Sequence, residues 1–321
     1  MLNELIEKAN AVYLENFSPE IYFERAIFLS WYCDVGDCTF CYMSTQKDIK
    51  NPKIAKRQVY SLYAEALISK HMNWKIGFIS GGYGMYDFDK VVEIVKNVHD
   101  ITGEKQNLNI GILPKNQLEK FRPYISGITG SVETTNRQLH DKVCPSKKLE
   151  PIEKMYAYCD GYKRIMTFIV GLGENISDFD SLKSFIINNK IDKIVLYALN
   201  PIKGTVFTKG PEPDYYLEWL ARTRIAFPKI EIVAGVWTSR INYLSKILRC
   251  GPNAITKMPA WKVVGSKKAE EMEEQFKIAE RKFMSRFDSF PDVDWGKEVE
   301  NLGFDQGTSR EILERIYKYT N

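Results

Sequence analysis

The sequence predicts a parallel (β/α)8 barrel, complete or nearly so, with helical extensions at both ends. Short β-branched segments alternate with amphipathic segments along most of the chain, and this alternation is typical of a parallel sheet. With 321 residues, of which 44% are hydrophobic and 13% aromatic, the chain is long enough for one such barrel. A doubly wound open sheet is the competing architecture.

The predicted strands are short apolar segments, most of them rich in β-branched residues. Eight segments meet this description: Arg25–Tyr32, Lys75–Ser80, Leu108–Leu113, Gly127–Glu133, Arg164–Val170, Lys193–Leu199, Glu231–Gly235 and Ala254–Met258. Because these segments alternate strictly with helical ones, we expect the strands to run parallel.

Helical periodicity separates these strands. Apolar residues recur at helical spacing after the first, second and fifth of them, in 55–67, 91–98 and 179–186. The pattern changes after the last strand, where charged segments carry apolar seams. We therefore expect an N-terminal helical extension over 1–24, the barrel over 25–265, and C-terminal helices packed on the barrel over 266–321.

The composition excludes several classes of protein. The net charge is only +4, and because Lys and Glu are interspersed, no basic patch indicates nucleic-acid binding. The N-terminus lacks the charged and apolar regions of a signal peptide, and no apolar run approaches the length of a membrane span. We therefore expect no membrane association and a cytoplasmic location.

Three cysteines dominate the functional signal. Cys33, Cys38 and Cys41 follow the first predicted strand within a single loop. Thiolates at this density hold a soft metal or an iron–sulfur cluster, and three ligands to a [4Fe–4S] cluster would leave one iron open. Structural zinc or a fully ligated cluster would each need a fourth ligand from elsewhere, such as His140 or Cys144.

Other unusual residues also fall at strand ends, where a parallel barrel carries its active site. Gly81 and Gly82 follow the second strand, Glu133 ends the fourth, and Gly171 follows the fifth. The glycine pair either lets the backbone approach a ligand closely or makes a tight turn. A carboxylate at position 133 would bind a ligand amine or hydroxyl groups.

Together these residues resemble the radical S-adenosylmethionine superfamily. The match is closest to the branch of biotin synthase, the [FeFe]-hydrogenase maturase that acts on the active-site cofactor, and methylornithine synthase, with proteins encoded beside the methanogen [Fe]-hydrogenase. The resemblance covers roughly residues 5–265. It includes the cysteine triad with the aromatic Phe40, the glycine pair, the motif Glu133–Asn136 and the segment Val170–Glu174.

The resemblance implies an enzyme with a [4Fe–4S] cluster on Cys33, Cys38 and Cys41, and S-adenosylmethionine on its open iron. Reductive cleavage would give a 5′-deoxyadenosyl radical that abstracts hydrogen from a small organic substrate. The pathway that the resemblance implies is the biosynthesis of a cofactor, of the hydrogenase-type metallocofactor kind. An external low-potential donor of the ferredoxin or flavodoxin type would supply the electron. The alternative is a non-enzymatic cluster carrier or electron-transfer protein on a barrel scaffold.

The resemblance also assigns further residues to cofactor binding. These are Phe40, Gly81, Gly82, Glu133, Gly171 and, as a substitute for a carboxylate-binding arginine, Lys154. The sequence departs from the family's pattern in two places. Four residues separate Cys33 from Cys38 and two separate Cys38 from Cys41, whereas the family usually has three and two. Tyr83 stands where many members have a glutamate. The cysteines that bind the second cluster of biotin synthase are not matched by the remaining cysteines, Cys144, Cys159 and Cys250.

The substrate site is expected among polar and aromatic residues near the strand ends. The candidates are Tyr83, Thr134, Asn200, Trp237 and Arg240. Aromatic residues at a barrel mouth often serve packing alone, and Arg240 either holds a substrate carboxylate or lies on the surface. A mostly aromatic site with few charges favours a small organic molecule over a protein or nucleic acid.

Overall fold

The computed structural model describes residues 1–46, 52–82, 84 and 86–320. In this part of the chain, eight parallel strands form a closed ring, because β1 (Glu20–Phe28) pairs with both β2 (Lys75–Ser80) and β8 (Ala254–Thr256). The other strands of the ring are β3 (Gln106–Asn109), β4 (Ile125–Glu133), β5 (Lys163–Val170), β6 (Lys193–Ala198) and β7 (Glu231–Gly235). The predicted barrel is therefore confirmed and is complete.

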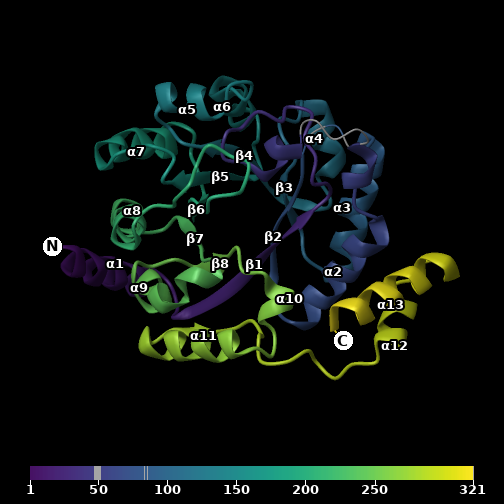
Figure 1. The fold of residues 1–321 in the computed structure, drawn as a ribbon. Coiled ribbons are helices and arrows are strands. Elements are labelled where there is room, and N and C mark those ends of the chain that lie inside the picture. Colours follow the sequence, from purple (N-terminus) through teal and green to yellow (C-terminus); the bar gives the residue numbers. More distant parts are fainter. Residues whose placement is uncertain (47–51, 83, 85, 321) are drawn as a thin grey trace.

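Helices surround the ring of strands (Figure 1). Helix α1 (Leu2–Asn16) precedes the barrel, and those connecting its strands are α2 (Val59–His71), α3 (Phe88–Thr102), α4 (Lys115–Phe121), α5 (Arg137–Val143), α6 (Leu149–Ala157), α7 (Phe179–Asn188), α8 (Pro213–Ala226) and α9 (Leu244–Arg249). Helices α10 (Ala260–Val263), α11 (Lys267–Ile278), α12 (Trp295–Glu300) and α13 (Gln306–Thr320) follow β8, with α11 packed on α9 and α13 on α2. None of the described helices is long and apolar enough to cross a membrane.

The first strand is displaced from its predicted position. It spans Glu20–Phe28 instead of Arg25–Tyr32, so the segment 1–24 contains the start of the barrel as well as α1. Leu29 N–H still donates to the Ser80 carbonyl at 2.7 Å, but the chain then leaves the ring because its backbone pairs with the segment before α2. Trp31 N–H donates to the Ala55 carbonyl at 3.0 Å, and Arg57 N–H donates to the Leu29 carbonyl at 3.0 Å.

Three other strands end earlier than the sequence suggests, and one of them, β6, stops a single residue early, at Ala198 rather than Leu199. β3 stops at Asn109 rather than Leu113, since the residues beyond it form the loop into α4. β8 stops at Thr256 rather than Met258 because Lys257 has a left-handed backbone, with φ of 73°. A β-strand cannot continue through that conformation.

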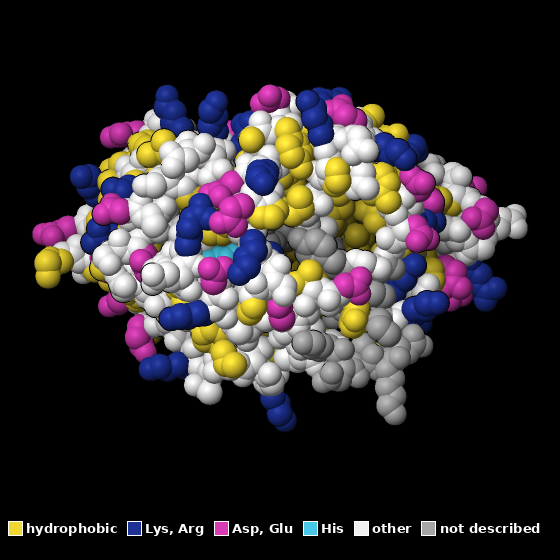
Figure 2. Space-filling view, turned by 90° about the horizontal axis from the view of Figure 1, so that it is seen from above, with side chains coloured by type: hydrophobic (Ala, Val, Ile, Leu, Met, Phe, Trp, Pro, Cys, Tyr) yellow, Lys and Arg dark blue, Asp and Glu magenta, His cyan; other side chains and the backbone are white. Residues whose placement is uncertain are grey.

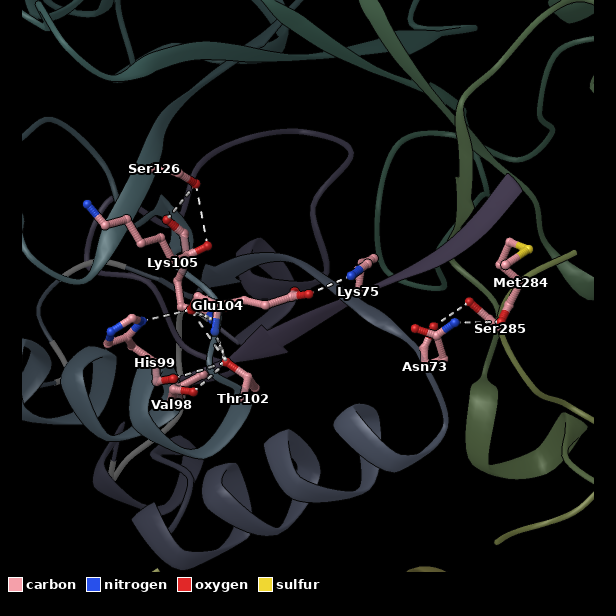
Figure 3. Close-up of polar contacts among 11 residues, drawn as sticks. Asn73, Lys75, Val98, His99, Thr102, Glu104, Lys105, Ser126, Met284 and Ser285 are labelled. Atoms are coloured by element: carbon pink, nitrogen blue, oxygen red, sulfur yellow. Dashed lines mark hydrogen bonds and ion pairs between the residues drawn. The ribbon is translucent and has the colours of Figure 1, made fainter. Parts of the chain in front are cut away.

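The C-terminal segment packs against the amino ends of β1 and β2. A short strand that the sequence did not suggest, β9 (Lys282–Phe283), pairs with the first residues of β1. Beyond it, Asn73 Nδ2 donates to the Met284 carbonyl and Ser285 Oγ donates to the Asn73 carbonyl, both at 2.7 Å (Figure 3). These contacts lie at the amino ends of two neighbouring strands and leave the carboxyl ends of the strands for a site.

The barrel interior below that site is filled. Its apolar part is a cluster from five strands: Phe78, Ile165, Val195, Val233 and Ala254. Beside this cluster, the buried Lys193 Nζ lies 2.6 and 2.8 Å from the two carboxylate oxygens of Glu24. Gly77 faces this pair, since a Cβ there would lie 2.8 Å from Glu24 Oε2. The interior is therefore a packed core with an ion pair as the floor of the site.

Candidate active site

A cavity of about 520 Å³ opens at the carboxyl ends of the strands. Its lining comes from most βα loops and includes Cys33, Cys38, Phe40, Cys41, Gly81, Gly82, Glu133, Asn200 and Trp237. Figure 2 shows one hollowed face of the molecule, with hydrophobic side chains gathered in the hollow. The structure thus brings nine of the predicted site residues to one cavity.

Backbone hydrogen bonds hold the cysteine loop against α5. Thr39 N–H donates to the Val143 carbonyl at 2.9 Å, and Cys41 N–H donates to the Cys38 carbonyl at 3.0 Å. Gly36 turns the loop with a left-handed backbone, φ 52°, where an L side chain is strained. All three thiols line the cavity and are partly buried.

The thiols differ in their environments. A hydrogen bond with the Cys144 thiol lowers the pKa of Cys38, whereas burial raises the pKa of Cys41. Cys144 is fully buried beside Cys38 and does not line the cavity. Three cavity-facing thiols fit the donor set of a [4Fe–4S] cluster with an open iron, although the described side chains do not form a ready metal-ligation geometry.

The glycine pair brings two backbone segments together. A Cβ at Gly82 would lie 1.7 Å from the Tyr32 carbonyl oxygen and 2.6 Å from Cys33 Cα. At Gly81 the nearest atom would be Leu29 Cβ at 3.2 Å. The loop after β2 therefore packs directly on the residues leading into the cysteine loop, and close approach of backbone explains Gly82 better than a tight turn does.

Glu133 occupies a strained position on the cavity wall. Its backbone is left-handed, with φ of 64°, which is uncommon for a residue other than glycine. Its carboxylate accepts hydrogen bonds from Lys147 Nζ and Thr167 Oγ1, both at 3.0 Å. Although burial opposes the charge on Lys147, the neighbouring Glu133, Cys144 and Cys38 hold its pKa well above the usual value.

The lysine at this cavity is Lys147, and the expected Lys154 lies elsewhere. Lys154 is exposed on α6, a helix that packs on the outer side of β4. Lys147 belongs to the loop between α5 and α6, and its side chain is only 12% exposed. The loop folds back over the strand ends, a path that sequence spacing along α6 does not indicate.

Three other predicted site residues do not line the cavity. Gly171 N–H donates to Glu174 Oε1 at 2.7 Å within the loop after β5. Thr134 is fully buried. Arg240 donates to the Pro211 carbonyl at 3.1 Å, in the loop before α8, and does not line the cavity. The remaining candidate, Tyr83, lies outside the described residues.

Lys257 is a cavity residue that the sequence did not single out, and it lies beside Tyr197, an expected residue of the barrel lumen or rim. Both line the cavity, and the Lys257 ammonium lies 4.8 Å from the centre of the Tyr197 ring. Burial lowers the pKa of Lys257, while the nearby Cys41 and Glu133 act in the opposite direction. A lysine inside the predicted apolar strand Ala254–Met258 was the available signal for Lys257.

His140 gives the site a pH-dependent stability. Burial and then Lys147 lower the pKa of His140 to about 4, and its Nε2 has no hydrogen-bond partner among the described residues. In the unfolded chain histidine titrates near 6.5, so between pH 6.5 and 4 the unfolded state binds the proton first. The contribution of His140 to the free energy of unfolding is therefore fully present above pH 6.5 and is lost as the pH falls toward 4.

We expect this histidine to cost the cluster-free protein about 2 kcal/mol of unfolding free energy between pH 7 and pH 5. Urea unfolding under reducing conditions at both pH values measures it. The variant His140→Gln should lose about 2 kcal/mol less than the parent over the same interval. An equal loss in both proteins would show that His140 titrates normally.

The chain has relatives among proteins of known sequence. No protein-family model matches the chain. An uncharacterized protein of Methanocaldococcus jannaschii is 36% identical over 307 residues, covering 93% of this chain and 85% of the relative. Biotin synthase of Clostridium tetani is 27% identical over 231 residues, covering 68% of this chain and 70% of that enzyme.

Two solved structures resemble the fold. Methylornithine synthase matches with a TM-score of 0.69 at 20% identity, over 79% of this chain and 77% of that one. An [FeFe]-hydrogenase maturase from Carboxydothermus hydrogenoformans matches with a TM-score of 0.68 at 13% identity, over 99% of this chain and 81% of that one. At such identities these likenesses bear on the fold alone.

Proposed function

Because the chain belongs to the radical S-adenosylmethionine superfamily, in the branch of biotin synthase, we propose that its cavity carries out radical chemistry on a small organic substrate. The chain shares its closer family with the protein of Methanocaldococcus jannaschii. It is an enzyme, and its cofactors are a [4Fe–4S] cluster and S-adenosylmethionine. One observation carries the proposal: three thiols and a buried Glu133–Lys147 pair line a single cavity at the carboxyl end of the barrel.

Cys33, Cys38 and Cys41 would hold the cluster in this proposal. When bound, the cluster and S-adenosylmethionine supply the one-electron cleavage that yields methionine and a 5′-deoxyadenosyl radical able to take hydrogen from the substrate. The chain's own part is to orient the reactants and to exclude water and other hydrogen donors. The packed interior below the cavity and the apolar lining of its wall support this role.

Glu133 and Lys147 would bind the amino-acid part of S-adenosylmethionine, with Phe40, Gly81 and Gly82 beside it. Glu133 offers a carboxylate to the ligand's amine, and Lys147 takes the carboxylate-binding role expected of Lys154. Because the two side chains are already hydrogen-bonded and nearly buried, they are held in place before a ligand arrives.

Lys147→Met should therefore weaken S-adenosylmethionine binding by about tenfold or more, as expected for losing one hydrogen bond between charged groups. Equilibrium dialysis with labelled S-adenosylmethionine on the reconstituted protein measures the change. Lys148→Met is the matched control, since that neighbouring lysine is exposed and pairs with Asp141 on the surface. Equal affinities of the two variants would contradict the role given to Lys147.

The substrate would lie against Asn200 and Trp237, both of which line the cavity. Thr134, Arg240, Gly171 and Tyr83 stay as predictions from the sequence. The resemblance motivates a place in the biosynthesis of a hydrogenase-type metallocofactor, with electrons from a ferredoxin or flavodoxin and a location in the cytoplasm. No nucleic acid is part of the proposal, since the net charge is only +4.

The test is anaerobic. The protein is reconstituted with iron and sulfide, reduced with dithionite and mixed with S-adenosylmethionine, and 5′-deoxyadenosine is assayed by chromatography. We expect product, and we expect S-adenosylmethionine to change the EPR spectrum of the reduced cluster. A well-formed cluster that yields no product and ignores S-adenosylmethionine would instead indicate a fully ligated cluster, for which Cys144 is the thiol beside Cys38.

A further inference from the structure

One of the charged side chains on the cavity wall has no ion-pair partner among the described residues. Among the described residues, five charged side chains line the cavity: Glu24, Arg25, Glu133, Lys147 and Lys257. Glu133 and Lys147 pair with each other, while Glu24 pairs with Lys193 and Arg25 with Glu65. Lys257 alone in this set forms no ion pair or hydrogen bond with another described residue, so one cation faces the cavity outside any ion pair.

Aromatic rings surround this cation instead. The Lys257 ammonium lies 4.8 Å from the ring centre of Tyr197, 5.9 Å from that of Trp237 and 6.0 Å from that of Phe28. The faces of such rings attract a cation but cannot accept its hydrogen bonds as a carboxylate would. Within the described part of the chain, the three ammonium protons therefore lack hydrogen-bond partners, and they are available to a ligand.

An unusual backbone conformation places Lys257 at the cavity. It follows the last residue of β8 in a left-handed conformation, with φ of 73°, and Glu133 has the same unusual conformation at the end of β4. Non-glycine residues held in this region cluster at ligand sites. Because three strands separate β4 from β8 on either side of the ring, the two residues approach the cavity from opposite walls.

We propose that Lys257 binds a carboxylate of the substrate, which is therefore a small organic acid with an apolar body. This inference rests on the proposed function for the identity of the site, since Glu133 and Lys147 on the opposite wall are assigned to S-adenosylmethionine. A carboxylate reaching the Lys257 ammonium forms the ion pair that the described residues do not supply and accepts its hydrogen bonds. The apolar remainder of such an acid fits among Tyr197, Trp237 and Phe28.

The test compares two probes of nearly the same shape, 4-fluorobenzoate and the uncharged 4-fluorobenzamide. Each is titrated with the reconstituted, unreduced holoenzyme in the presence of S-adenosylmethionine, and ¹⁹F NMR line broadening gives its Kd. The parent should bind the benzoate at least about tenfold more tightly than the amide, as for a hydrogen bond between charged groups. Equal binding of the two probes, or binding of neither, would overturn the proposal.

Two variants identify the residue and the source of the carboxylate. Lys257→Met should remove the preference for the benzoate, and Lys257→Arg should keep most of it, while the Kd for S-adenosylmethionine changes less than about twofold. Persistence of the preference in Lys257→Met would overturn the assignment. Loss of S-adenosylmethionine binding in that variant would show that Lys257 holds the cofactor's own carboxylate, which also overturns it.

The proposed function can fail separately. If the parent prefers the benzoate through Lys257 but forms no 5′-deoxyadenosine after reduction, the anion site stands and the radical chemistry does not. If it forms 5′-deoxyadenosine but shows no preference between the probes, the radical chemistry stands and the substrate class proposed for Lys257 is overturned.

Discussion

A variant in which Cys33, Cys38 and Cys41 are all replaced by alanine should form 5′-deoxyadenosine only at background level. The three thiols line one cavity, and a cluster deprived of all three would have no ligands of the required kind on that wall. The barrel should remain folded, because the cysteines lie on a partly exposed loop outside the apolar core. Iron content, product formation and thermal unfolding are the three measurements.

The matched control is Cys159→Ala. Cys159 is fully buried in the main core and lies away from the cavity lining, so its replacement should leave product formation intact and lower stability by about 1 kcal/mol. The two variants thus have opposite expected profiles. Cleavage retained by the triple variant would refute the assignment of these cysteines, whatever its stability.

Gly82→Ala should inactivate the enzyme nearly as completely, even though position 82 has no side chain to contribute. The added Cβ would stand 1.7 Å from the Tyr32 carbonyl oxygen and 2.6 Å from Cys33 Cα. These are backbone atoms, so relief requires a shift of the segment that carries the first cysteine. We expect at least about a hundredfold loss of product formation and a destabilisation of about 1–3 kcal/mol.

Gly296→Ala is the control for this substitution. A Cβ there would meet the side chain of Asp294 at 3.2 Å, and that side chain can move. We expect activity and iron content close to those of the parent. If Gly82→Ala retained both as well, the β2 loop would not pack on the cysteine loop as closely as the structure indicates.

Much of the fold follows from local patterns in the sequence. The run Lys75–Ser80 and the run Glu231–Gly235 are strands with the predicted boundaries, because both are apolar segments bounded by clear breaks. β1 is displaced because the apolar residues after Phe28 pair with the segment before α2, a contact between distant parts of the chain. The two-residue β9 exists only through its pairing with β1, and no local signal marks it.

By itself, the sequence determined the barrel, the cysteine triad and the superfamily, because hydrophobic periodicity and cysteine spacing are local properties of the chain. The tertiary structure decided which lysines face the cavity. Lys147, and not Lys154, reaches Glu133 since the loop before α6 folds over the strand ends, and Lys257 faces the cavity through the left-handed backbone after β8. Direction of a side chain at a loop depends on where the loop packs, and that is set by contacts between segments far apart in sequence.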